Sequence, residues 1–179
     1  MRHEIRVAGY GGQGVILAGL LIGKAAALYD GKEAAFTQSY GPEARGGASC
    51  ANIVISNEPI DYPMVTHPDH FVVMFQEAYE RYHYTLIKDG VLLIESDLVK
   101  PSPNEGPYRG IPATRIAEEL SRRIVANVIM VGFFCGATGL VSREAAEEAI
   151  RTTAPPRVVD LNLRAFARGY EYALAGVKA

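Results

Sequence analysis

The stretch Ile5-Arg6-Val7-Ala8-Gly9-Tyr10-Gly11-Gly12-Gln13-Gly14, followed by a long apolar run, decides the fold class. Residues 5–9 have the composition of a short strand, and a glycine-rich turn then leads into a predicted helix over residues 15–29. Lys24 is the only charged residue of that helix. A strand, a tight glycine turn and a helix are typical of the start of an α/β unit. Because one charge is too few for a solvated face, we expect the helix to be nearly all buried.

The rest of the chain continues this alternation of strands and helices. Strands are predicted at residues 34–39, 48–56, 71–75 and 91–95, and helices at 76–87, 112–122, from 127, from 142 and at 160–175. Residues 48–56 alternate only weakly, so that strand is expected to be covered on both faces. Residues 100–108 contain three prolines and are predicted to be a loop. The pattern predicts a single α/β domain over residues 1–179, in three layers, with a largely parallel or mixed central sheet flanked by helices.

Composition narrows the class of protein. Apolar residues make up 49% of the chain and charged residues 21%, which is typical of a globular protein. The net charge of −2 supplies no basic surface for a phosphate backbone, which argues against nucleic-acid binding. The charge-free residues 124–142 contain Asn127 and several glycines, which favours a buried helix over a membrane span. Residues 1–7 carry charges where a signal peptide would be apolar, so we expect a cytoplasmic protein.

The glycine turn admits two interpretations. Gly9 to Gly14 satisfies G-x-G-x-x-G between a strand and a helix, where a dinucleotide pyrophosphate binds in many oxidoreductases. That fingerprint also requires an acidic residue at the end of the second strand to hold the ribose hydroxyls. Here the second strand ends in Gln38 and Ser39, which weakens the dinucleotide hypothesis. The alternative is that these glycines only form a tight turn.

A second motif, Ser39-Tyr40-Gly41-Pro42-Glu43-Ala44-Arg45-Gly46-Gly47, follows the second strand. Arg45 can bind a carboxylate or phosphate through two parallel hydrogen bonds, and the glycines permit close backbone approach. The simpler alternative is a solvated surface turn with a Glu43–Arg45 pair. If the second strand runs parallel beside the first, both motifs leave the sheet at one edge, and Arg45 lies close to the glycine loop.

Together, in this order and at this separation, the two motifs resemble the gamma subunits of 2-oxoacid:ferredoxin oxidoreductases. The resemblance rests on Gly11-Gly12-Gln13-Gly14 and on Ser39-Tyr40-Gly41-Pro42-Glu43 with Arg45-Gly46-Gly47. Further matches are Ile55-Ser56 with Pro59-Ile60, Ile111-Pro112-Ala113-Thr114 with Ile116-Ala117, Asn127, and Asn162, Phe166 and Gly169. The resemblance therefore spans almost the whole chain.

The resemblance implies a complex that oxidatively decarboxylates a 2-oxoacid, transfers the acyl group to coenzyme A and reduces ferredoxin. It implies thiamine diphosphate, Mg²⁺ and iron–sulfur clusters on the alpha and beta subunits, with a delta or ferredoxin-like subunit as a further candidate partner. This chain has no glycine–aspartate–glycine thiamine signature, and its two cysteines, Cys50 and Cys135, have no cluster spacing. We therefore expect this chain alone to bind no cofactor, to supply no catalytic residue and to be inactive when isolated.

The resemblance to the gamma subunits implies that this chain has a structural role in the complex and controls substrate access. On this basis the motifs are expected to bind coenzyme A phosphates or an acidic partner surface. The expected residues are Gly11, Gly12, Gln13, Gly14, Ser39, Tyr40, Glu43, Arg45, Gly46, Gly47 and Asn127. The second motif and the residues after it look closest to the 2-oxoglutarate and branched-chain members. The equivalent subunit of a pyruvate or indolepyruvate oxidoreductase, and a free-standing dinucleotide-binding oxidoreductase, remain alternatives.

The remaining polar and aromatic residues give weaker indications. His67 and His70 flank Pro68-Asp69 with no further ligand nearby in sequence, which favours a surface turn over a metal site. Tyr79, Tyr82 and Tyr84 are expected to be core or interface aromatics. Asn127, besides its match to the family, is suited to cap the helix that it begins.

Overall fold

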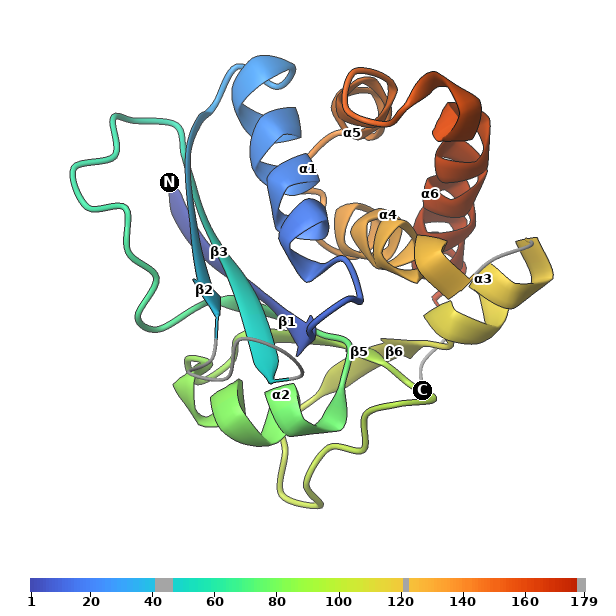
Figure 1. Cartoon of the computed structure of the whole chain (residues 1–179). Helices are drawn as coiled ribbons and strands as arrows, with labels where there is room; N and C mark the ends of the chain where they lie inside the picture. Colours follow the sequence, from blue (N-terminus) through green and yellow to red (C-terminus); the bar gives the residue numbers. More distant parts are fainter. Residues whose placement is uncertain (41–46, 121–122, 177–179) are drawn as a thin grey trace.

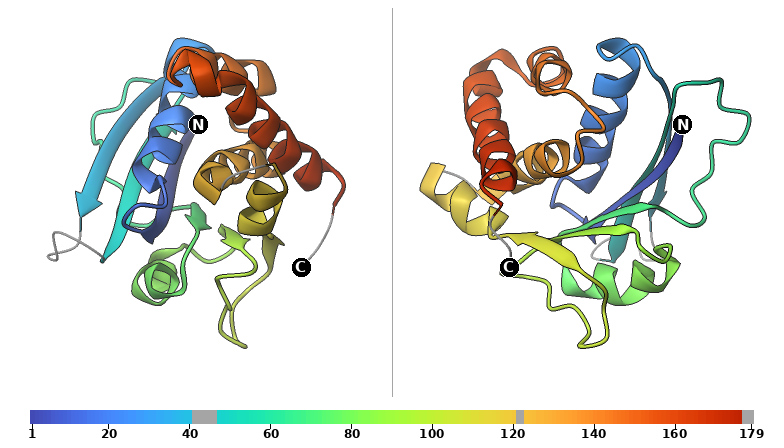
Figure 2. Two further views of the ribbon diagram at one scale, coloured as in Figure 1. Left: turned by 45° about the vertical axis from the view of Figure 1, so that its right-hand side comes forward. Right: turned by 180° about the vertical axis from the view of Figure 1, so that it is seen from behind.

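The computed structural model describes residues 1–40, 47–120 and 123–176. In this part of the chain a six-stranded sheet is covered by helices on both faces (Figures 1 and 2). Helix α2 lies against one face, and the other described α-helices gather on the opposite face. The three-layer α/β architecture expected from the sequence is confirmed.

The sheet is mixed, with the strand order β2-β3-β1-β4-β5-β6. The strands are β1 (Arg2–Tyr10), β2 (Glu33–Tyr40), β3 (Ala48–Ser56), β4 (His70–Val73), β5 (Val91–Glu95) and β6 (Tyr108–Ile111). Strand β3 is antiparallel to both of its neighbours, β1 and β2. The pairings from β1 through β4 and β5 to β6 are parallel. Strands β1 and β2 therefore point the same way, although they are not adjacent.

The helices follow the order expected from the alternating pattern. They are α1 (Val15–Leu28), α2 (Gln76–Tyr82), α3 (Ala113–Leu120), α4 (Ala126–Thr138), α5 (Arg143–Arg151) and α6 (Val159–Leu174), with short 3₁₀ turns at His83–Thr85, Arg123–Val125 and Pro156–Val158. Ser142 caps α5 by accepting a hydrogen bond from the Ala145 amide, as its sequence position indicated. Among the described residues, no helix combines the length and apolar composition that a membrane crossing requires.

Alternating side chains of the strands lie in two separate hydrophobic cores, one on each face of the sheet. Ile5, Val7 and Ile53 face α1 and α4, whereas Ala8 and Phe71 face α2. All residues of β3 are buried, which confirms that this strand is covered on both faces. The second core is why a strand that pairs antiparallel carries almost no polar alternation.

Helices α4 and α6 pack closely because glycines face each other across their contact. A Cβ atom on Gly132 would collide with the carbonyl oxygen of Phe166, and one on Gly169 with that of Ile129. Both obstacles are backbone atoms of the opposite helix, which cannot move aside as a side chain could. The charge-free segment of residues 124–142 is thus a core helix, and its glycines set the distance to α6.

Two local predictions were wrong, and one strand was missed. The helix expected over residues 76–87 ends at Tyr82 and continues only as a 3₁₀ turn. The loop expected over residues 100–108 is confirmed as far as Pro107, but the edge strand β6 that begins at Tyr108 was not predicted, because its four residues are too few to show a period. Helix α1 is not nearly all buried, because Leu17, Leu20 and Leu28 are exposed.

The tyrosines near α2 have mixed environments. Tyr79 lies in the α2 core, and its hydroxyl donates to the carboxylate of Glu105. Burial and this hydrogen bond raise the pKa of Tyr79 to about 12. Tyr82 packs against the same core, whereas Tyr84 is exposed. Of these three tyrosines, Tyr84 therefore remains a candidate interface aromatic.

Candidate functional site

The glycine loop joins the carboxyl end of β1 to the amino end of α1. Gly12 and Gly14 have φ angles of 99° and 76°, in the left-handed region that favours glycine. Gly14 is the N-cap of α1, and none of the described side chains caps this helix end. The first turn of α1 also carries no acidic residue. Its amide donors and its positive dipole end are therefore available to an anionic group.

Gln13 holds the loop in shape. Its side-chain Nε2 donates to the carbonyl oxygen of Met74 at 3.1 Å, and its Oε1 accepts from the Tyr10 amide at 2.7 Å. A side chain at Gly9 would collide with this amide. Because both ends of the Gln13 amide are engaged within the chain, Gln13 positions the loop rather than presenting a free donor.

Asn127 supports the loop from α4. Its Nδ2 donates to the Gly14 carbonyl oxygen at 3.1 Å, and its side chain leaves no room for a Cβ atom on Gly14. The N-cap of α4 is Val125, so the prediction that Asn127 caps the helix was wrong. Asn127 is only 3% exposed, and its Oδ1 has no hydrogen-bond partner among the described residues. A buried amide oxygen without a partner is a free acceptor beside the loop.

Part of the second motif reaches the same edge of the sheet. The Gly11 amide donates to the Gly47 carbonyl oxygen at 3.3 Å. Tyr10 pairs with Ala48 and Tyr40 with Ser49, so β1 and β2 end at the same edge of the sheet, one on each side of β3. The expectation that the second strand lies beside the first was wrong, because β3 lies between them. The shared edge arises instead because two antiparallel pairings restore the original direction.

The remaining residues of the motif are placed only in part. Ser39 is exposed and pairs with Cys50. Glu43, Arg45 and Gly46 lie outside the described residues. The closeness of Arg45 to the glycine loop therefore stays a prediction.

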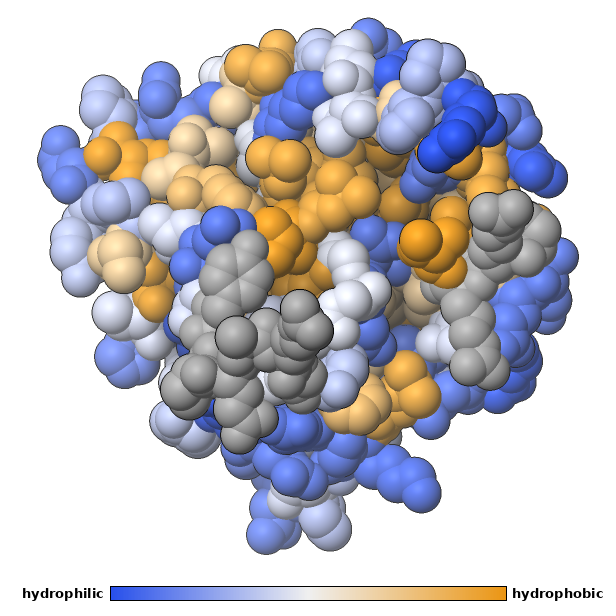
Figure 3. All heavy atoms as spheres, viewed as in Figure 1, coloured by the Kyte–Doolittle hydropathy of each residue, from blue (hydrophilic) through white to orange (hydrophobic). Residues whose placement is uncertain are grey.

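A cavity of about 840 Å³ opens beside the glycine loop. It is bounded by the loop and α1, the start of α4, the end of α5 and the turn before α6. Leu17, Leu21 and Ile124 supply apolar wall, and Asn127 and Arg157 supply polar groups. Figure 3 shows apolar surface spreading across this face of the molecule, over α1 and towards α4.

Sequence patterns gave no indication of two features of this cavity. Arg157 is exposed and forms no ion pair with any described residue, so its guanidinium is free to bind an anion. Ile124 is 75% exposed and Leu20, on α1, is 41% exposed. Exposed apolar side chains grouped around a cavity are typical of a surface that contacts another protein. No motif surrounds Arg157, and only the packing of α4, α5 and α6 places it on the wall of the cavity that the loop also lines.

A buried carboxyl group lies at the same edge of the sheet, at the end of β5. Glu95 is fully buried, its Oε1 accepts from the Thr114 amide at 3.3 Å, and its Oε2 has no partner among the described residues. Burial raises the pKa of Glu95 above its ordinary value, and the nearby charge of Asp97 adds to that rise. Glu95 is two strands away from β1, so it belongs to the packing of α3 rather than to the glycine loop.

Comparison with known proteins assigns the family. Residues 4–172 match the pyruvate ferredoxin/flavodoxin oxidoreductase family. The chain belongs to this family. It is similar to 2-oxoglutarate synthase subunit KorC of Methanocaldococcus jannaschii, with 51% identity over 97% of this chain and 95% of the relative. Membership of this family supports the subunit interpretation over that of a free-standing dinucleotide-binding enzyme.

Two solved structures share the fold. The gamma subunit of a keto/oxoacid ferredoxin oxidoreductase from Geobacter sulfurreducens matches with a TM-score of 0.89 and 44% identity, over 98% of each chain. The 2-oxoglutarate:ferredoxin oxidoreductase of Magnetococcus marinus, with 2-oxoglutarate, coenzyme A and succinyl-CoA bound, matches with a TM-score of 0.86 and 26% identity. That match covers 99% of this chain and 32% of the longer one. The fold thus occurs both as a separate subunit and as part of a larger chain.

Proposed function

We propose that this chain is the gamma subunit of a 2-oxoglutarate:ferredoxin oxidoreductase. The observation that carries the proposal is the end-to-end similarity to a 2-oxoglutarate synthase subunit, at 51% identity. In the proposed reaction 2-oxoglutarate loses CO₂, its acyl carbon forms a thioester with coenzyme A, and the two electrons released pass to ferredoxin. The products are succinyl-CoA, CO₂, a proton and two reduced one-electron ferredoxin equivalents.

The redox and thiamine cofactors are assigned to the other subunits. Thiamine diphosphate with Mg²⁺ would supply the decarboxylation chemistry there, and iron–sulfur clusters would carry the electrons. The cysteines of this chain do not fit a cluster. Cys50 lies in the core beneath α2, and Cys135 lies in the core on the opposite face of the sheet. Both are buried, so they cannot ligate one cluster together.

The glycine loop and its cavity are suited to hold the phosphates of coenzyme A. The uncapped amino end of α1 offers amide donors, and Arg157 adds a positive charge beside the cavity. Asn127 offers a buried acceptor to a donor group of the ligand. Arg45, in the second motif, is proposed to complete the anion site from the adjoining edge.

The apolar surface around the cavity is proposed to contact the catalytic subunits. Leu17 and Leu20 are exposed on α1, and Ile124 is exposed on the 3₁₀ turn that precedes α4. Burying these side chains against an alpha or beta subunit would remove from water the apolar area that the isolated chain leaves exposed. The cavity would then lie between this chain and its partner. In that position this chain would cover the entrance for coenzyme A.

A reconstitution experiment tests the function. The alpha and beta subunits are purified with and without this chain, and coenzyme A-dependent ferredoxin reduction is measured with 2-oxoglutarate, pyruvate and a branched-chain 2-oxoacid. We expect activity with 2-oxoglutarate that requires this chain, and none from this chain alone. Equal turnover without the chain would contradict the proposed role as a subunit. A preference for pyruvate would contradict the proposal that 2-oxoglutarate is the substrate.

A further inference from the structure

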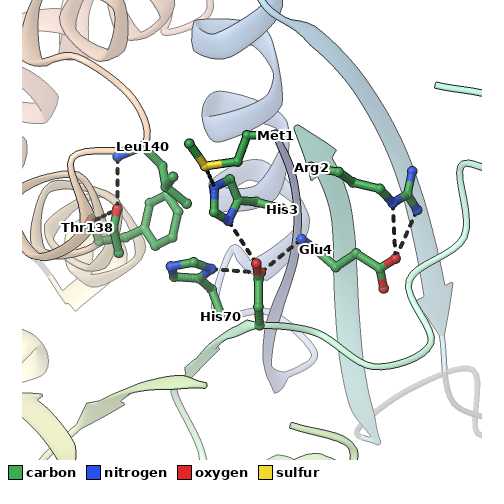
Figure 4. Close-up of polar contacts among 9 residues, drawn as sticks. Met1, Arg2, His3, Glu4, His70, Thr138 and Leu140 are labelled. Carbon is green, nitrogen blue, oxygen red and sulfur yellow. Dashed lines mark hydrogen bonds and ion pairs between the residues drawn. The ribbon is translucent and has the colours of Figure 1, made fainter. Parts of the chain in front are cut away.

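Three potential metal ligands meet at the edge of the sheet opposite the glycine loop (Figure 4). His3 comes from the start of β1, and Asp69 and His70 lie at the start of β4. Because β1 and β4 are parallel neighbours, their amino ends lie together, although the residues are more than sixty positions apart. This cluster is separate from the cavity and does not depend on the proposed function.

One carboxylate, that of Asp69, contacts a nitrogen of each imidazole ring. His3 Nδ1 lies 2.8 Å from Asp69 Oδ2, and His70 Nδ1 lies 2.8 Å from Asp69 Oδ1. One nitrogen from each ring and a carboxylate oxygen all lie within 4.8 Å of one another. Tetrahedral coordination at about 2.0–2.2 Å places neighbouring ligand atoms roughly 3.3 Å apart. An ion therefore fits after side-chain shifts of less than about an ångström.

The backbone holds the carboxylate in this position. The Glu4 amide donates to Asp69 Oδ1 at 2.9 Å, and the Asp69 amide donates to the Glu4 carbonyl oxygen at 2.9 Å. The Asp69 carbonyl oxygen accepts from the Val91 amide at 2.8 Å. Asp69 is thus tied to β1 on one side and to β5 on the other. Fixed ligands of this kind bind metals more tightly than mobile ones, because less side-chain freedom is lost.

Packing holds the rings but leaves an entry path. The His70 side chain is 10% exposed and packs edge-on against Phe134 and His3, with ring centroids 6.1 and 5.5 Å apart. The side chains of His3 and Asp69 are 21% and 24% exposed. An ion can therefore enter from solvent on the side of His3. The sulfur of Met1 lies 3.0 Å from His3 Nε2, which fixes the second nitrogen of that ring.

We propose that His3, Asp69 and His70 form a binding site for a divalent transition metal ion, with Zn²⁺ the best match. Two imidazole nitrogens and one carboxylate oxygen suit zinc and its neighbours, whereas calcium and magnesium require oxygen ligands. Water completes the coordination. Because the ligands join the start of β1 to the start of β4, the bound ion stabilises the fold. The site could not be predicted from sequence patterns, because His3 is 66 residues away from Asp69 along the chain.

Metal titration of the full chain tests the proposal. The chain is prepared with a histidine-free affinity tag, treated with chelator, and titrated with Zn²⁺ and, for its visible spectrum, Co²⁺. We expect one ion per chain, a rise in Tm on binding, and a Co²⁺ spectrum without thiolate charge-transfer bands. The wild type is compared with Asp69→Asn, His3→Gln and the matched control His67→Gln, which removes an exposed histidine from the same turn.

The variants decide between a metal site and a closed hydrogen-bond network. Asp69→Asn and His3→Gln should each weaken binding at least tenfold, whereas His67→Gln should bind like the wild type. Circular dichroism confirms that each variant is folded, and His3→Gln alone carries the test if Asp69→Asn is not. Equal affinity in all variants, an equal loss in the His67 control, or no binding by the wild type at 100-fold ion excess would each overturn the proposal.

Discussion

The Asn127 side chain donates a hydrogen bond to the carbonyl oxygen of Gly14, 3.1 Å away, and so joins α4 to the glycine loop. Replacing Asn127 with Ala removes this bond and leaves the Gly14 carbonyl oxygen with the Ala18 amide as its remaining donor. We expect the free energy of unfolding to fall by about 0.5–1.5 kcal/mol, the net contribution of a typical hydrogen bond. Asn127→Asp removes the donor and adds a charge, so it should lower the free energy of unfolding further. Urea denaturation measures both, and unchanged midpoints would contradict the role of Asn127.

Close packing of α4 on α6 predicts an effect of small substitutions. A methyl group on Gly132 meets the backbone of Phe166, so Gly132→Ala should lower the free energy of unfolding by about 1–3 kcal/mol. The matched control is Gly23→Ala in α1, where the nearest atom lies 3.6 Å from the added carbon. That change should be neutral or stabilise by about 0.5–1 kcal/mol, because alanine favours a helix. Thermal or chemical unfolding compares the two variants, and similar effects from both would contradict the packing account.

The buried carboxyl of Glu95 predicts a pH dependence of stability. Burial raises its pKa in the folded chain above the ordinary value of 4.5, so ionisation costs free energy only when the chain is folded. The stability that Glu95 permits is complete below about pH 4.5 and is lost as the pH rises through the folded pKa. Glu95→Gln keeps the acceptor for the Thr114 amide and should be more stable than wild type at pH 8, with the difference shrinking towards pH 4. Denaturation across this range checks it, and a constant difference would refute the assignment to ionisation.

Substitutions at two neighbouring leucines of α1 are expected to distinguish an effect on folding from an effect on assembly. Leu21 is buried, so Leu21→Asp should unfold the chain or prevent assembly. Leu20 is 41% exposed, so Leu20→Asp should leave the Tm of the isolated chain within a few degrees of wild type. If α1 contacts a catalytic subunit, Leu20→Asp should nevertheless weaken assembly at least tenfold. Calorimetry and size-exclusion chromatography of the mixed subunits measure the two effects. A well-assembled Leu20→Asp complex would place the interface elsewhere.

The second motif predicts an anion contact at Arg45. Arg45→Ala should weaken coenzyme A affinity, subunit affinity or both by about 1.5–3 kcal/mol, the range for a hydrogen bond to a charged group. Arg45→Lys should restore only part of the loss, because an ammonium cannot reproduce the planar guanidinium. Both affinities are measured on the reconstituted complex. If neither changes, the motif is a structural turn.

Much of the fold could be predicted because its signals are local. The position of β5 follows from a continuous apolar run, that of β3 from a weakly alternating one, and the turn after β1 from its glycines. The edge strand β6 was missed because its four residues follow a proline-rich loop and carry no period. Asn127 was noticed, but its role was not, because its partner, the Gly14 carbonyl oxygen, is 113 residues away in the sequence.

The sequence by itself determined the alternation of strands and helices, the position of the glycine turn after the first strand and, through its motifs, the family. These follow from backbone preferences and residue order, which are properties of short segments. Only the tertiary structure decided the order of the strands, which places β3 between β1 and β2, and the meeting of His3 with Asp69 and His70. It also decided which leucines of the apolar helix α1 remain exposed. The physical reason is that burial and long-range contacts depend on how helices pack against the sheet, which no single segment encodes.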